Sequence, residues 1–276
     1  MSVSLPFRTA IEAGVKTLFH YQKFQADYIA NVLLRDRIKY SDPRTFNDPW
    51  DCRPRFSKSL LNDPEAYERH VKYVIDVQRR MLGIPENELT RRERILRTDK
   101  AFMEARIDEC TQAMCEAVGE QYRVYCLSSL PDNFLMWAHY TGSHKGVCFG
   151  FKTESDRFCA ALEVKYSKTY PEVDLSSEDE LAFLHDTQLT KAEQWGYEKE
   201  FRLLAKEGGS PKSLAVSDGF ASFETRDLSL VIVGCLISDD NLRAIREIIT
   251  QRKSSVPLYQ VRPAPDRYEL VLQEIR

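Results

Sequence analysis

A block of charged helices divides this chain and restricts the possible folds more than any other feature. Asp63 followed by Pro64 is a favourable helix start, because aspartate caps free backbone amides and proline fits the first helical position. The pattern on both sides of the block mixes strands and helices, so we expect one domain over 1–276 with a helical insertion at about 62–119. Helices of the block are predicted over Asp63–Leu82, Glu86–Arg97 and Asp99–Val118, with Gly119 as the final cap.

The rest of the chain carries short apolar runs that are typical of strands. Helices are expected near 26–37, after a cap at Asp132, near 178–195 and at 241–252. A mixed sheet with separate helices indicates the α+β class. Strands are predicted at Thr17–His20, Ile38–Ser41, Tyr122–Ser128, Gly146–Phe151, Glu163–Tyr166, Glu200–Ala205, Leu214–Val216, Leu230–Leu236, Leu258–Val261 and Tyr268–Gln273.

Charge and cysteine content exclude several classes of protein. The chain has 39 basic and 42 acidic side chains, a net charge of −3, which argues against general coating of nucleic acid. The 7 cysteines include no C-x-x-C pair, and several lie in apolar runs, which favours buried thiols in a reducing cytoplasm. No apolar run reaches ~18 residues and no secretion signal is evident, so we expect a cytoplasmic protein without a membrane partner.

Four segments combine aromatic, histidine and acidic residues more densely than packing alone requires. We expect them to converge on one cleft although they are far apart in the sequence. They are Phe19–Tyr21, Thr45–Trp50, Leu135–Tyr140 with His144–Gly146, and Trp195–Arg202.

Taken together, the four segments resemble a bacterial family known as domain of unknown function 2971. The shared pattern is an N-terminal aromatic motif, a Phe-Asn-Asp-Pro turn at 46–49, a Met-Trp-Ala-His-Tyr helix leading to His-Lys-Gly, and Trp-Gly-Tyr-Glu-Lys-Glu-Phe-Arg at 195–202. The resemblance covers roughly residues 17–235 and implies no activity by itself.

The order of elements also resembles the ADP-ribosyltransferase superfamily, at the level of the fold. This resemblance implies mixed, mainly antiparallel sheets and NAD as the cofactor, which would be cleaved between nicotinamide and ribose. His20 would hold the NAD ribose or amide, Tyr140 would stack on nicotinamide, and Glu200 would be the catalytic acid, with Glu198 beside it. The acceptor would be a protein or nucleic acid, and the resemblance implies a setting in a toxin or phage-defence system. Further residues expected to bind NAD are Tyr21, Asn47, Asp48, Ser128, Trp137, His139, Lys145 and Arg202.

Glu198 and Glu200 suit this chemistry because a carboxylate stabilises the oxocarbenium-like centre that forms when the glycosidic bond breaks. On a strand, two residues separated by one share a face. Two buried acids need a function or a neighbouring cation. The alternative is a solvated edge strand in which Lys199 and Arg202 neutralise both glutamates.

Two other enzyme-type sites have weaker support. His139, His144 and Cys148 have a ligand-like spacing, but no acidic fourth ligand is near, so we expect no metal site. A magnesium-dependent nuclease would use Asp132 with Glu163 and Lys165, a short pattern that arises easily by chance.

The alternative outside enzymes is a binding module that holds a nucleotide or peptide without consuming it. Its pocket would be aromatic, with Glu198 and Glu200 pairing basic groups. The aromatic residues would be Trp50, Trp137, Trp195, Tyr140 and Tyr197.

Overall fold

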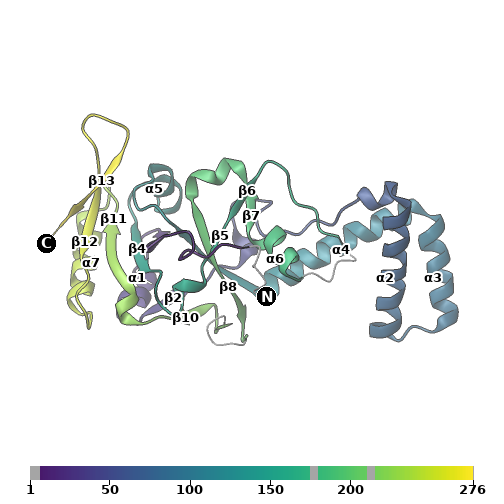
Figure 1. Ribbon diagram of the computed structural model, residues 1–276. Helices are drawn as coiled ribbons and strands as arrows, with labels where there is room; N and C mark the ends of the chain where they lie inside the picture. Colours follow the sequence, from purple (N-terminus) through teal and green to yellow (C-terminus); the bar gives the residue numbers. More distant parts are fainter. Residues whose placement is uncertain (1–6, 175–179, 210–214, 276) are drawn as a thin grey trace.

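The computed structural model describes residues 7–174, 180–209 and 215–275. Its main sheet has the order β13-β12-β11-β4-β1-β3-β8-β5, with β9 added beside β8 (Figure 1). The pairs β11–β12 and β8–β9 are parallel and the other pairs of this sheet are antiparallel, so the fold is α+β with a mixed, mainly antiparallel sheet, as predicted. The strands are β1 Thr17–Gln22, β3 Tyr122–Ser128, β4 Val147–Lys152, β5 Leu162–Glu163, β8 Glu200–Glu207, β9 Ala215–Val216, β11 Leu228–Val233, β12 Leu258–Pro263 and β13 Leu270–Glu274.

Two small sheets complete the strand set. One pairs β2 Arg37–Lys39 with β10 Phe220–Ser222, and the other pairs β6 Lys165–Ser167 with β7 Thr190–Ala192. The remaining helices outside the inserted block are α1 Ala26–Leu34, α5 Phe134–Tyr140, α6 Glu180–Gln188 and α7 Asp239–Thr250. Short 3-10 turns lie at Pro43–Thr45, Ser59–Asn62, Phe158–Ala160, Glu193–Glu198 (η4) and Thr225–Asp227.

The two faces of the main sheet are covered by different helices because side chains alternate along each strand. Leu18 and Phe149 join the apolar cluster that contains residues of α1 and α7. Their neighbours Phe19 and Cys148 join a second cluster with Trp137 of α5. We therefore call the two sides of the sheet the α1 face and the α5 face, after the helices that pack on them.

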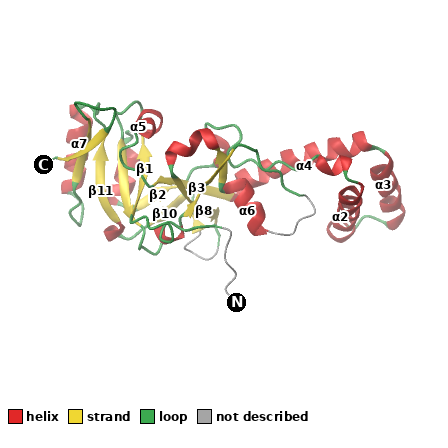
Figure 2. Ribbon diagram, turned by 45° about the horizontal axis from the view of Figure 1, so that its top comes forward, coloured by secondary structure: helices red, strands yellow, loops and turns green. Residues whose placement is uncertain are grey.

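The helical block forms an arm that projects from the sheet (Figures 1 and 2). It consists of α2 Pro64–Leu82, α3 Glu86–Thr98 and α4 Lys100–Gln121 and has its own apolar cluster. Asp63 caps α2 as predicted, since its Oδ1 accepts from the amides of Glu65 and Ala66. None of the described helices is long and apolar enough to cross a membrane.

Several predicted boundaries are wrong. Gly119 does not end α4, which continues to Gln121; its missing side chain instead leaves room for Arg44. The cap of α5 is Asn133 rather than Asp132, because the Asn133 side chain accepts from two helix amides. The helix expected over 178–195 ends at Gln188, where the chain turns into β7 and η4. Residues 178–179 and 214 of the predicted elements lie outside the described residues.

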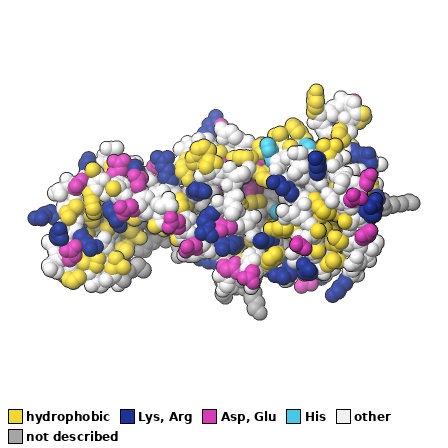
Figure 3. Space-filling view, turned by 180° about the vertical axis from the view of Figure 1, so that it is seen from behind, with side chains coloured by type: hydrophobic (Ala, Val, Ile, Leu, Met, Phe, Trp, Pro, Cys, Tyr) yellow, Lys and Arg dark blue, Asp and Glu magenta, His cyan; other side chains and the backbone are white. Residues whose placement is uncertain are grey.

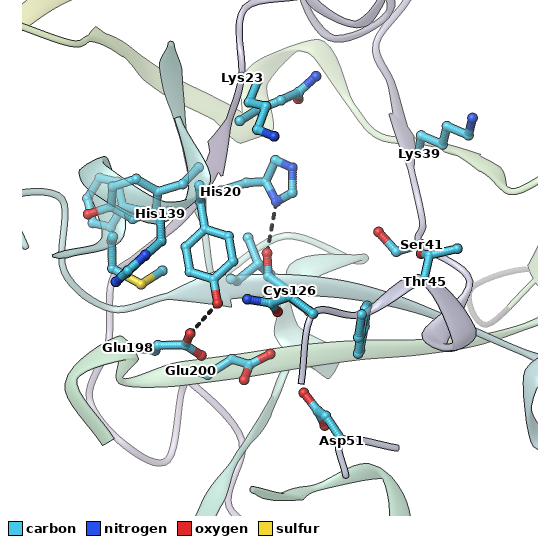
Figure 4. A pocket seen from close by; sticks show the side chains of 18 of the residues that line it. His20, Lys23, Lys39, Ser41, Thr45, Asp51, Cys126, His139, Glu198 and Glu200 are labelled. Carbon is cyan, nitrogen blue, oxygen red and sulfur yellow. Dashed lines mark hydrogen bonds between the residues drawn. The ribbon is translucent and has the colours of Figure 1, made fainter. Parts of the chain in front are cut away.

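The sheet is incomplete between β1 and β3. β1 pairs with β4 along its whole length, from Thr17 to Gln22, but with β3 only at Phe19 opposite Ser128. Beyond that pair the two strands separate, and Figure 4 shows the side chains that line the opening. This split in the sheet positions the candidate site.

Candidate functional site

A cavity of about 440 Å³ lies at the split, a volume within the range of small-molecule sites. All four polar and aromatic segments contribute to it, so they converge on one cavity as the sequence predicts. Its lining includes Phe19, His20, Tyr21, Thr45, Phe46, Asn47, Met136, His139, Tyr140, Glu198 and Glu200.

Five buried charged side chains form an ion-pair network at this cavity, and we call them the charge cluster: Asp51, Lys191, Glu198, Glu200 and Arg202. The first four line the cavity, whereas Arg202, which was expected to bind NAD, lies behind them and does not. Arg202 is fully buried and binds Asp51 through two parallel bonds, with Nη1–Oδ1 at 2.8 Å and Nη2–Oδ2 at 2.7 Å. Its Nε donates to Glu200 Oε1 at 2.8 Å. Lys191 Nζ donates to Glu198 Oε2 at 2.6 Å and to Glu200 Oε2 at 3.2 Å.

The pKa values of Glu198 and Glu200 are shifted in opposite directions. Burial, together with the negative charge of Glu200, raises the pKa of Glu198 to about 7. Burial also acts to raise the pKa of Glu200, but the adjacent Arg202 and Lys191 outweigh it and hold that pKa well below the usual range. Three carboxylates face two cations, so protonation of Glu198 makes the charge cluster neutral. Glu198 is therefore the member that exchanges a proton near neutral pH.

Glu198 is positioned by a turn and not by the strand. It ends η4, and Lys199 adopts a left-handed φ of 46°, which directs its own side chain to solvent and lets β8 begin at Glu200. Ser128 Oγ donates to the Glu198 carbonyl at 2.6 Å and fixes this turn. The expectation that both glutamates share one strand is wrong, although their carboxylates do meet.

The alternative of a solvated edge strand is also wrong. β8 lies between β3 and β5, and Glu198 and Glu200 are only 2% and 3% exposed. Lys199 does not neutralise them, because it is exposed; Lys191 and Arg202 do. Tyr140 adds a second contact to Glu198, with its hydroxyl donating to Oε1 at 2.5 Å.

His20 enters the cavity from the other face of the sheet. Alternation along β1 places it on the α1 face, where its ring stacks on Tyr125 with 4.2 Å between centroids. Glu200 projects on the α5 face, since Phe201 next to it belongs to the α1-face cluster. Both residues line one cavity only because β1 and β3 separate and the cavity passes through the sheet. The placement of His20 and Glu200 on opposite faces of the sheet counts against the resemblance to ADP-ribosyltransferases.

The tautomer of His20 follows from its partner. Nδ1 lies 2.8 Å from the carbonyl of Cys126, which can only accept, so Nδ1 carries the hydrogen. Burial lowers the pKa of His20 to about 4, so the ring is neutral at pH 7. Nε2 is therefore left as a hydrogen-bond acceptor.

The α1 side of the cavity is basic. Lys23 and Lys39 line it, are exposed, and have no ion-pair partner among the described residues. The Lys39 ammonium lies 5.4 Å from the ring centroid of Tyr28, which also lines the cavity. Figure 4 shows the two lysines on one side and the glutamates on the other. The cavity therefore has an unneutralised cationic end and an acidic end.

Several residues expected to bind a cofactor have structural roles and do not line the cavity. Ser128 is fully buried and holds the Glu198 turn, and Trp137 Nε1 donates to the Pro131 carbonyl at 2.9 Å. Asp48 accepts from the Trp50 amide within its turn. Lys145 is exposed in a tight turn before Gly146.

Gly146 explains the His-Lys-Gly motif by packing. A Cβ at this position would lie 2.2 Å from the Gln22 carbonyl oxygen and 2.8 Å from that of Thr141. His144 has a left-handed φ of 63° and its amide donates to the Trp137 carbonyl. The motif is thus explained by the close approach of the backbone at Gly146 to the carbonyl oxygens of Gln22 and Thr141.

The other enzyme-type patterns are separated or already paired. Glu163 forms two bonds with Arg8, at 2.6 and 2.8 Å, and Lys165 is exposed. Over the described ranges 7–174, 180–209 and 215–275, no group of three or more His, Cys, Asp or Glu side chains is arranged to hold a metal ion.

Two members of the charge cluster were not identified from the sequence. Asp51 directly follows the Phe-Asn-Asp-Pro-Trp segment, so an extension by one residue would have included it. Lys191 lies inside the helix predicted near 178–195 and belongs to no motif. It is brought to the glutamates by β7, whose pairing with β6 was not predicted.

Comparison with known proteins gives one match. The model of a family described as protein of unknown function (DUF2971) matches residues 136–203. This segment runs from α5 through the first half of β8 and so contains Tyr140, Lys191 and both glutamates, but neither His20 nor Asp51. No curated protein and no solved structure matches the chain. The likeness to this family is therefore narrower than the 17–235 expected, and no match supports the resemblance to ADP-ribosyltransferases.

Proposed function

We propose that the chain is an enzyme that cleaves the bond between nicotinamide and ribose in NAD and transfers the ADP-ribosyl group to a macromolecular acceptor or to water. The observation that carries this proposal is Glu198, a buried carboxylate with a pKa near 7 that faces a ligand-sized cavity and is held by Tyr140 and Lys191. A general base works best when its pKa lies near the working pH.

The two ends of the cavity support a ligand with this charge pattern. Lys23 and Lys39 suit the negative phosphates of a dinucleotide. The acidic end suits the nicotinamide ribose, which gains positive charge as the glycosidic bond breaks and its electron pair leaves with nicotinamide. The cluster carries a net charge of −1 when Glu198 is ionised, and Glu198 can then accept the proton that the attacking hydroxyl or amine loses.

The roles proposed for Glu198 and Glu200 differ from those that the resemblance to ADP-ribosyltransferases implies. Glu200 is bound by both Arg202 and Lys191 and holds its charge, so it stabilises positive charge but is a poor proton acceptor. Glu198 takes the proton-transfer role instead. Tyr140 is a hydrogen-bond donor to Glu198 in this proposal and does not stack on nicotinamide.

The test measures nicotinamide release from NAD by the purified protein, with and without cell lysate as a source of acceptors. Glu198→Gln keeps the size of the side chain but cannot accept a proton, and we expect release to fall by ~10²–10³. Glu193→Gln is the matched control, because Glu193 lies in the same turn η4 but is exposed, and it should retain the wild-type rate. Equal rates in the two variants would remove Glu198 from the mechanism.

A binding module with the same cavity makes a different prediction. It would bind NAD or ADP-ribose in calorimetry, lose affinity in a Lys23→Ala/Lys39→Ala double variant, and release no nicotinamide under any condition. The charge cluster would then be a structural element only, with Glu198 as its neutral member.

A further inference from the structure

A second cavity lies inside the helical arm. It has a volume of about 370 Å³, within the range of small-molecule sites, and all three arm helices line it. α2 contributes His70, Val74 and Gln78, which are spaced by four and lie on one face of that helix. The lining includes the exposed side chains of Phe102 and Arg106, so the cavity opens to solvent and a ligand can enter it.

His70 is the polar group that points to a ligand. Its side chain is only 4% exposed, and its Nδ1 is buried without a hydrogen-bond partner among the described residues. Buried polar atoms in folded proteins are almost always paired, and each exception needs an explanation. Burial lowers the pKa of His70 by more than the nearby carboxylate of Asp174 raises it, so the neutral ring can donate one hydrogen bond from Nδ1.

The rest of the lining is apolar with two arginines. Val74 and Phe102 belong to the apolar part, and Phe102 is partly exposed at 42%. Arg92 and Arg106 also line the cavity; each has a carboxylate partner, Glu88 and Glu109, that uses only part of the five donors of a guanidinium. The lining thus combines an apolar wall with the hydrogen-bond donors of His70, Arg92 and Arg106.

We propose that the helical arm binds a small amphiphilic carboxylate, with an alkyl or aryl body between α2, α3 and α4 and its carboxylate hydrogen-bonded by His70 and the neighbouring arginines. This site is separate from the charge cluster and does not depend on the function proposed for it. Its helix α4 leads directly into β3, the strand that carries Cys126, the partner of His20.

Octanoate and 1-octanol are the probes, measured against the full chain by calorimetry. We expect saturable binding of octanoate and at least tenfold weaker binding of 1-octanol, which lacks the carboxylate. His70→Leu should weaken octanoate at least tenfold. Val74→Trp should abolish binding by filling the cavity, whereas Lys72→Trp, which places the same indole on the exposed side of α2, should bind as wild type.

Three results would overturn the proposal: no octanoate binding to the wild type, equal binding of both probes, or equal binding by Val74→Trp and Lys72→Trp. If circular dichroism shows that Val74→Trp does not fold, the His70→Leu variant provides the test instead. An unchanged octanoate affinity in His70→Leu would show that His70 does not bind the carboxylate and would overturn the proposal.

Discussion

The helical arm and the charge cluster are both rich in pairs of basic and acidic side chains, but the pairs lie in different surroundings. In the arm, Arg97 contacts Glu68 and Glu93 with its side chain 38% exposed, and basic and acidic groups are interspersed over the surface (Figure 3). In the cluster, Arg202 is fully buried and its carboxylate partners are 3% exposed. Water screens the exposed pairs of the arm. The buried pairs of the charge cluster are not screened, and good hydrogen-bond geometry must offset the cost of removing their charges from water.

The same residue types therefore have different roles in the two regions. Exposed pairs contribute little to stability. Buried charges are costly unless they are paired and balanced, and the charge cluster is electrically neutral only when Glu198 carries a proton. Glu198 is therefore the member of the charge cluster that can release and take up a proton in a reaction.

The largest expected effect is the difference in unfolding free energy between a variant that lacks Arg202 and one that lacks Arg97. Arg202→Met leaves Asp51 and Glu200 without their main partner and should lower the free energy of unfolding by ~3–5 kcal/mol. Arg97→Met should lower it by less than ~1 kcal/mol. Urea denaturation of both variants gives the comparison. A loss of the same size in each would mean that burial does not distinguish the two regions.

The next effect concerns pH. The folded pKa of Glu198, about 7, lies above its unfolded value near 4.5. The folded state therefore binds more protons between these values, and the stability that Glu198 contributes is present below pH 4.5 and is lost as the pH rises to 7. The full loss is up to about 3 kcal/mol, since one pKa unit corresponds to about 1.4 kcal/mol.

The measurement is the difference in unfolding free energy between wild type and Glu198→Gln, followed from pH 5 to 8. We expect the wild type to lose stability relative to the variant up to about pH 7 and to stay level above it. Glu93→Gln in the arm, where the carboxylate is exposed, should show no such trend. A flat difference for Glu198→Gln would mean that Glu198 is ionised throughout.

The sequence predicted the arm better than the site. Helical periodicity and the Asp63–Pro64 start are local signals, so α2 to α4 could be placed within a few residues. The site depends on contacts between distant segments: Arg202 meets Asp51 across 151 positions, and β7 brings Lys191 to the glutamates. The segments that converge were identified by composition, but the split between β1 and β3 and the opposite faces of His20 and Glu200 have no local signature.

Two glycines give a smaller contrast between the regions. Gly146→Ala would place a Cβ 2.2 Å from the backbone carbonyl of Gln22, which is fixed by pairing with Val147, and should cost ~1–3 kcal/mol. Gly119→Ala in α4 would meet only the side chain of Arg44, with the new Cβ 2.4 Å from its Cγ and Cδ. This side chain is half-exposed and must move, at the expense of its surface pair with Asp42. Alanine favours a helix by up to ~1 kcal/mol over glycine, so this variant should be neutral or stabilising. Thermal unfolding of the two variants checks the order.

The smallest effect tests the arm's ion pairs themselves. Lys58 donates to Glu104 Oε1 at 3.1 Å and to Asp108 Oδ2 at 2.9 Å, both on α4, and its side chain is 35% exposed. Even so, Lys58→Ala should lower the free energy of unfolding by only ~0.5 kcal/mol, because each exposed pair gains little in water. The loss should vanish in 0.5 M NaCl, where screening acts over a few ångströms. Lys191→Met in the charge cluster should keep its full loss at the same salt concentration, since its partners are only 3% exposed. Salt dependence that is the same for both lysines would show that solvent reaches the cluster, and the assignment of a raised pKa to Glu198 would lose its physical basis.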